Sequence, residues 1–191
     1  LSWAPLSDPA LDAVEQLLLY LGALLAALAL LRDERIARAA EPVLALGALA
    51  AIGYGLAGRL LPGVVDMLQD RSLGAGGRLE QPITYWNAEG LLAALGLVLC
   101  VRIAGDRSRP DVLRLAAAGA VPALGLGVYL SYSRGAAAAA FLALLVLLAV
   151  APSWSQLRAV GCGVLSGAMA AACSSAFPGV ASLNGTAAER E

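Results

Sequence analysis

The feature that most constrains this chain is its series of long apolar runs, separated by short charged islands. An α-helix crosses the hydrocarbon core of a bilayer with about 20 such residues. The chain is 60% hydrophobic and only 14% charged, whereas an ordinary soluble domain is roughly 45–50% apolar. A soluble fold has too little interior for that surface, so we expect an all-α, polytopic transmembrane helix bundle.

The apolar runs predict about six spans within a single transmembrane domain that covers residues 1–191. The predicted spans are residues 13–31, 43–61, 85–104, 115–132, 136–151 and 159–177. The longest polar stretch, residues 62–84, is predicted to be an extracytoplasmic loop, with a short interfacial helix near residues 64–68.

Charge and cysteine content argue against two classes of function. A formal net charge of -1 leaves no broad basic surface for a nucleic-acid partner. Cys100, Cys162 and Cys173 lie inside apolar runs, in a spacing that fits neither a metal site nor a disulfide framework. We therefore expect all three thiols to pack as small hydrophobic groups.

The arginines of alternate connections predict the orientation of the chain. One set of connections holds eight of them: Arg32, Arg35, Arg38, Arg102, Arg107, Arg109, Arg114 and Arg158. The other set holds five: Arg59, Arg71, Arg78, Arg134 and Arg190. By the positive-inside rule the first set faces the cytoplasm. Both termini, the loop 62–84 and the turn 133–135 then lie outside.

Two arginines on the outer side are candidate ligands for an anion. Arg134 stands between two apolar runs with no acidic neighbour in sequence. Such a charge either snorkels to the headgroups or binds something anionic. Arg78 precedes the third apolar run on the same side. Together the two guanidinium groups would match the oxygens of a phosphate or diphosphate, if the fold brings them together.

Glu89 and Asn87 open the third apolar run and have alternative roles. Glu89 is a candidate for a general base, a partner for one of the arginines, or simply an acidic residue favoured in the first turn of a helix. Asn87 is a candidate helix N-cap, which needs no catalytic role.

Two motifs resemble one family of bacterial membrane proteins. Residues 78–88, RLEQPITYWNA, lead into an apolar run, and residues 132–136, YSRGA, open another one hairpin later. This combination resembles the O-antigen ligase and polymerase family, over about residues 78–150. Members of that family are polytopic glycosyltransferases of the GT-C type. They transfer a glycan from an undecaprenyl diphosphate carrier at the outer face of the cytoplasmic (inner) membrane to an acceptor lipid or glycan.

The resemblance implies roles for individual residues. Arg78 and Arg134 match arginines expected beside the carrier's diphosphate, Tyr85 and Asn87 would shape the pocket, and no metal or other cofactor is implied. The family's catalytic histidine lies in a later extracytoplasmic loop, whereas this sequence has no histidine and does not begin with methionine. We therefore expect a fragment of a larger GT-C-like fold that supplies the carrier site without the base.

Two other classes remain open at the level of sequence. In a transporter or permease segment, Glu89 and broken helices would form substrate or proton sites. In a structural membrane subunit, the arginines would only anchor helices at the headgroups. An inverted repeat between the two halves would favour transport, and none is evident in the sequence.

The arginine asymmetry gives a topology prediction. With the native cysteines replaced, Ser133→Cys should react with an impermeant thiol reagent in intact cells, and Ser108→Cys should react only after the membrane is permeabilised. The opposite pattern would place Arg134 in the cytoplasm and remove the case for chemistry at the outer face.

Overall fold

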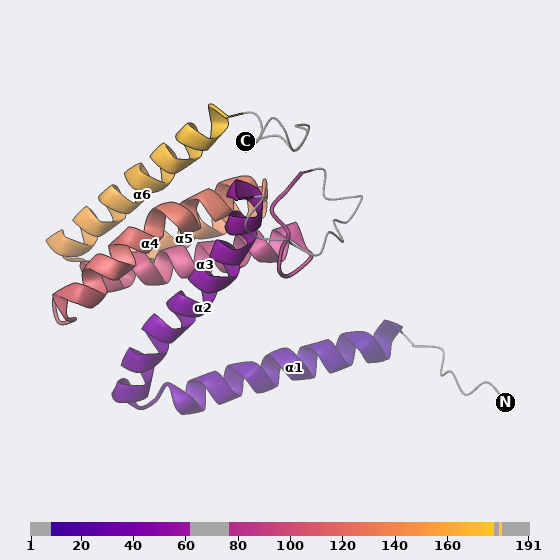
Figure 1. Ribbon diagram of the computed structural model, residues 1–191. Helices are drawn as coiled ribbons and strands as arrows, with labels where there is room; N and C mark the ends of the chain where they lie inside the picture. Colours follow the sequence, from indigo (N-terminus) through magenta and orange to yellow (C-terminus); the bar gives the residue numbers. More distant parts are fainter. Residues whose placement is uncertain (1–8, 62–76, 178–179, 181–191) are drawn as a thin grey trace. The chain divides into compact units, whose positions relative to one another are not determined.

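The computed structural model describes residues 9–61, 77–177 and 180, and in this part of the chain every regular element is an α-helix (Figure 1). The helices are α1 (Pro9–Leu30), α2 (Glu34–Leu60), α3 (Trp86–Gly105), α4 (Asp111–Leu130), α5 (Arg134–Val150) and α6 (Trp154–Ser175). The predicted interfacial helix near residues 64–68 lies outside the described residues. The all-α architecture predicted from the apolar runs is confirmed for the described part.

Five of the six described helices are long and apolar enough to cross a bilayer. The exception is α5, which is strongly apolar but has 17 residues, or roughly 25 Å of helix against roughly 30 Å of hydrocarbon. Helix length and composition together support a multi-pass membrane protein.

Several helices begin earlier than the apolar runs predicted. α2 begins at Glu34 rather than near residue 43, and α6 begins at Trp154 rather than near residue 159. Polar residues supply these extra turns: Glu34 pairs with Arg38 at 3.8 Å, and the Ser153 hydroxyl accepts a hydrogen bond from the Gln156 amide. Apolarity marks the part of a helix that lies in lipid, whereas backbone hydrogen bonds and caps set its ends.

The chain divides into two compact units, residues 1–40 and residues 41–191. In the described part, the first unit holds α1 and the beginning of α2. Within that unit α1 has no bundle to pack against, and its leucines are exposed. The second unit holds the rest of α2 and α3 to α6, and it contains the hydrophobic core.

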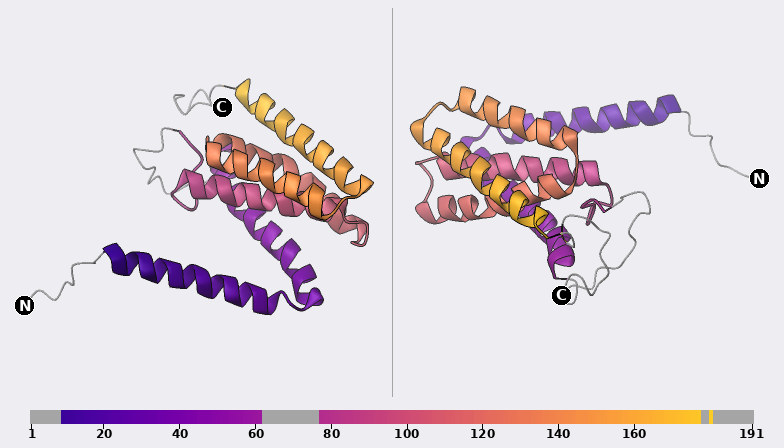
Figure 2. Two further views of the ribbon diagram at one scale, coloured as in Figure 1. Left: turned by 180° about the vertical axis from the view of Figure 1, so that it is seen from behind. Right: turned by 90° about the horizontal axis from the view of Figure 1, so that it is seen from above.

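Small residues let the helices of the second unit pack closely around α3. More than half of the apolar stretch of α3 is buried, and α3 packs against α4, α5 and α6. Figure 2 shows α3, α4 and α5 running side by side, with α6 crossing them at an angle. A Cβ at Gly127 of α4 would lie 2.6 Å from Ile52 Cγ2, and one at Gly125 would lie 2.8 Å from Gly167 Cα. The glycines of α4 thus allow α2 and α6 to approach.

Ion pairs join α2 to the turn between α3 and α4. Glu41 of α2 lies 2.5 Å from Arg109 and 3.5 Å from Arg102, and Arg109 also lies 3.5 Å from Asp106. The Ser108 hydroxyl donates to Asp106 at 2.7 Å, and this hydrogen bond, supported by the two arginines, lowers the pKa of the Asp106 carboxyl. These contacts fix one end of the second unit.

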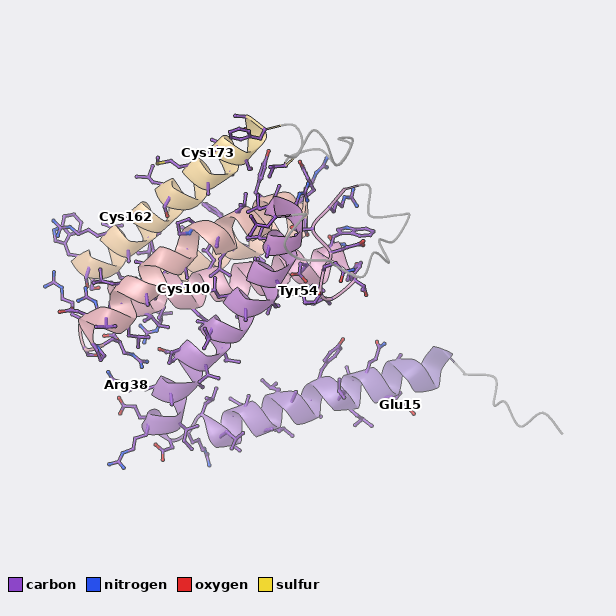
Figure 3. The ribbon with its side chains drawn as sticks, viewed as in Figure 1. Glu15, Arg38, Tyr54, Cys100, Cys162 and Cys173 are labelled. Carbon is purple, nitrogen blue, oxygen red and sulfur yellow. The ribbon has the colours of Figure 1, made fainter. Side chains whose placement is uncertain are left out.

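The three cysteines are free thiols in different environments. Cys100 is buried in the core on α3, as predicted, whereas Cys162 and Cys173 are exposed on α6 (Figure 3). An exposed thiol on an apolar membrane helix still lies in apolar surroundings where lipid covers that face. All three can be replaced for the labelling experiment described above without breaking a disulfide. Because Ser133 is buried, the exposed Gly135 two residues later is the better position for the outer cysteine.

Two glycines of α4 give a matched test of this packing. Gly127→Ala should lower the midpoint of thermal unfolding in detergent, because its Cβ would press against Ile52, and overpacking costs about 1–3 kcal/mol. Gly119→Ala on the same helix meets no atom within 4 Å, so it should leave the midpoint unchanged or raise it. Equal effects of the two substitutions would show that α2 does not pack on α4 in this way.

Candidate functional site

A backbone hydrogen bond brings the segment before α3 to the end of α4. The Leu79 N–H donates to the Leu130 carbonyl at 2.9 Å, and the Leu79 side chain is buried. Gly55 of α2 supports the same segment, because any Cβ there would collide with the Gln81 carbonyl oxygen. These contacts hold Arg78 beside the turn between α4 and α5.

The turn between α4 and α5 is short and tightly bonded. Tyr132 has a left-handed φ of 50°, a conformation uncommon for residues other than glycine. The Ser133 amide donates to the Ser131 hydroxyl at 3.2 Å, and the Ser133 hydroxyl accepts from the Ala136 amide at 3.2 Å. Ser133 is therefore the N-cap of α5, and Arg134, which we had predicted to lie in a turn, is the first residue of the helix.

Gly90 on α3 lets this turn approach the start of α3. A Cβ at Gly90 would collide with the Ser131 hydroxyl oxygen and would lie 3.0 Å from Ala136 Cβ. The absence of a side chain at this position brings the start of α3 to the turn that leads into α5. Together with the Leu79–Leu130 bond it gathers three segments: residues 77–85, the start of α3, and this turn.

Arg134 occupies a position where a cation is electrostatically unfavourable. The first N–H groups of a helix carry partial positive charge and lack intrahelical partners. The Ser133 hydroxyl satisfies one of them, that of Ala136. The N-terminus of α5 thus combines a guanidinium group with backbone donors, and an anion would be stabilised by both.

The three segments form the polar end of an open cavity of about 1270 Å³. The polar end is lined by Arg78, Trp86, Asn87, Tyr132, Ser133, Arg134 and Gly135. The rest of the wall is apolar and consists of Leu97 of α3, Gly125, Val128 and Tyr129 of α4, Ala137, Ala140, Phe141 and Leu144 of α5, and Gly163, Val164, Gly167, Ala168 and Ala171 of α6. The cavity is therefore amphiphilic.

The apolar part of the cavity is a groove between α5 and α6. α5 packs mainly on α3 and α6 mainly on α4, and the two helices scarcely touch each other. Leu144 follows Arg134 by ten residues along α5, which is roughly 15 Å of helix axis. The length of the groove from the charged end is thus about half the thickness of a bilayer's hydrocarbon core.

Neither arginine of the cavity forms an ion pair with a carboxylate of the described residues. The Arg78 guanidinium carbon lies 4.8 Å from the centroid of the Trp86 ring, a cation–π contact. Both arginines are exposed. Their N–H donors are consequently available to a ligand in the cavity.

Tyr85 and Asn87 are placed differently with respect to the cavity. Asn87 lines it, and its side-chain amide donates to the Tyr85 hydroxyl at 3.0 Å. Tyr85 does not line the cavity, but its ring lies 5.5 Å from that of Trp86. The N-cap of α3 is Tyr85, so Asn87 does not cap this helix as the sequence had suggested.

Glu89 is fully buried and does not line the cavity. Neither carboxylate oxygen has a hydrogen-bond partner in the described part of the chain. The described residues also contain no group of three or more His, Cys, Asp or Glu side chains that could hold a metal ion.

Sequence reasoning missed most of the cavity wall. Trp86 had not been predicted to line a site, and neither had the apolar groove. Gly90 and the Ser133-x-x-Ala136 spacing, which is typical of an N-cap, were the available signals for the polar end. No family model, curated protein or solved structure with which the chain was compared matches it.

Proposed function

We propose that this chain is part of a bacterial membrane glycosyltransferase similar to O-antigen ligases and polymerases. In this proposal the cavity binds an undecaprenyl diphosphate-linked glycan at the outer face of the cytoplasmic membrane. The observation that carries the proposal is that two arginines, which have no carboxylate partner among the described residues, line the polar end of an apolar groove. An anionic headgroup on a long apolar chain is the ligand chemistry that suits both parts.

The polar end suits a diphosphate because it has two sources of positive charge on separate segments. Arg134 and the N-terminal amides of α5 would bind one phosphate, and Arg78 would bind the other. Guanidinium groups donate bidentately to phosphate oxygens and keep their charge near lipid. During glycan transfer the bond between the sugar and the diphosphate breaks, and the same donors would stabilise the negative charge that develops on the departing diphosphate.

The apolar groove suits a prenyl chain. Its walls are aliphatic side chains and glycines from α5 and α6, with the Phe141 ring among them. Burial of apolar chain surface contributes about 25 cal/mol per Å², so the groove would favour a lipid-linked diphosphate over the free anion. A lipid diffusing in the membrane would enter between α5 and α6, where the two helices separate.

We assign these residues to carrier binding and leaving-group stabilisation only. The general base of the reaction and the acceptor, a lipid or a glycan, are not assigned. Arg78 and Arg134 carry no proton-transfer role in this proposal, because an arginine stays protonated in proteins.

One observation favours the rival class of transporter. Glu89 is a buried carboxyl group inside a candidate span, and such groups often mark proton or substrate pathways. Glu89 does not line the cavity, however, whereas Arg78 and Arg134 do. Carrier binding at the arginines therefore has the stronger structural support.

The proposal predicts a graded effect of substitutions at Arg134. Arg134→Ala should weaken binding of an undecaprenyl diphosphate analogue in nanodiscs about tenfold or more, because a charge-assisted hydrogen bond contributes roughly 1.5–3 kcal/mol. Arg134→Lys keeps the charge but loses the planar fork, so its affinity should lie between those of Arg134→Ala and the wild type.

Arg158→Ala is the matched control, because Arg158 is also exposed but lies on α6 away from the cavity lining. It should bind the analogue with wild-type affinity. Equal affinities in the wild type and both Arg134 variants would show that Arg134 is only an interfacial anchor, and the proposal would then lose its main support.

Glu89→Gln separates the two candidate functions. Under the carrier-binding proposal it should leave the affinity for the diphosphate analogue unchanged, because Glu89 does not line the cavity. Under the transport alternative it should abolish proton uptake into vesicles that contain the protein, because glutamine does not titrate. Proton flux that depends on Glu89, together with no binding of the diphosphate analogue, would favour the transporter.

A further inference from the structure

We infer that Trp86 is a positioning residue that holds the Arg78 guanidinium at the cavity and so sets a preference for diphosphate over monophosphate headgroups. This inference rests on the proposed function. It concerns how one of the two arginines is kept in a geometry that binds an anion.

The two arginines differ in how they are fixed. Arg134 is the first residue of α5, and the Ser133 cap defines where that helix starts. Arg78 precedes α3 in a non-helical segment, which is held by the backbone bond of Leu79 to Leu130. That bond fixes the Cα position of Arg78 but leaves the rotamers of its long side chain free, and their entropy opposes binding.

Trp86 restrains that side chain in a way that keeps its donors available. The guanidinium carbon of Arg78 lies 4.8 Å from the centroid of the Trp86 ring. A stacked guanidinium group uses its planar face, whereas hydrogen bonds to an anion use its N–H edge. A carboxylate partner would instead occupy that edge, and Arg78 has none among the described residues.

The Trp86 ring is itself well placed to act as a support. Trp86 is the first residue of α3, half-buried, and it lines the cavity. Its ring lies 5.5 Å from the Tyr85 ring, a tilted aromatic pair. Trp86 is part of α3, which has the largest buried share of the candidate spans. The ring that contacts Arg78 is therefore attached to a firmly packed helix.

The two arginines would then serve different phosphates. The N-terminus of α5 with Arg134 is sufficient to bind one phosphate, and the Arg78 guanidinium adds a bidentate pair of N–H donors for the second. Loss of the Trp86 contact should therefore weaken diphosphate binding and leave monophosphate binding nearly unchanged. A purely structural role of Trp86 would lower both affinities together.

The test compares the full chain in nanodiscs with farnesyl diphosphate, farnesyl monophosphate and inorganic pyrophosphate as probes. Trp86→Leu should lower the affinity for farnesyl diphosphate about two- to fivefold, the range expected for an exposed cation–π contact. Trp86→Phe keeps an aromatic face and should restore most of the affinity. Inorganic pyrophosphate tests whether the site needs the lipid chain. A site that binds only the anion should bind pyrophosphate as tightly as farnesyl diphosphate, whereas a site that also binds the chain should bind pyrophosphate more weakly than farnesyl diphosphate.

A double-mutant cycle ties the effect to Arg78. In the Arg78→Ala background, Trp86→Leu should cause no further loss of diphosphate affinity. Trp154→Leu is the matched control, because Trp154 is 72% exposed and lies outside the cavity. It should leave all three affinities unchanged. The thermal midpoint of each variant checks folding. If Trp86→Leu does not fold, Trp86→Met, which also lacks an aromatic face, completes the cycle with Arg78→Ala.

The outcomes separate this inference from the proposed function. If the wild type binds no farnesyl diphosphate, the proposed function fails. If the wild type binds and Arg78→Ala loses the preference for diphosphate while Trp86→Leu keeps it, the positioning role of Trp86 is wrong. Equal losses for diphosphate and monophosphate in Trp86→Leu would contradict it as well.

Discussion

The site depends on the hydrogen bond from the Leu79 amide to the Leu130 carbonyl. A carbonyl at the end of a helix and an amide in an irregular segment both need partners where water is scarce. This bond satisfies both groups, and it places Arg78 beside the turn that presents Arg134. Without it the segment that carries Arg78 would not be held beside the turn that leads into α5, and the cavity would lose one side of its polar end.

The helices were predictable from the sequence because apolar runs of membrane length have few alternatives. Their ends were less predictable. Glu34, Arg134 and Trp154 begin helices although none of them extends an apolar run. Caps and local ion pairs decide these positions, and their energies are small beside the burial of a whole span in lipid.

The candidate site was predictable only in parts. Arg78 and Arg134 stood out because charges are rare beside apolar runs, but nothing in the sequence indicated that they line one cavity. Their meeting depends on a backbone bond, which leaves no residue pattern, and on Gly90, which is visible in the sequence although the segment that it contacts is not. Glu89 stood out by residue type alone, yet it lies outside the cavity. The groove between α5 and α6 results from helix packing, which uniformly apolar sequences do not specify.

The position of Arg78 in the same cavity helps to decide between two roles for Arg134, which are anchoring at the headgroups and binding of an anion. A lone arginine at the end of a short apolar helix is explained by snorkelling to the headgroups, and it needs no ligand. Two cations that line one cavity repel each other, and a helix N-terminus adds positive charge to the same place. Repulsion of this kind lowers stability unless water or an anion compensates for it. A bound diphosphate would offset the repulsion directly, so the empty site should be less stable than the occupied one. Snorkelling would explain each arginine separately, whereas a bound anion would also explain why two cations with no carboxylate partner among the described residues line the mouth of one apolar groove.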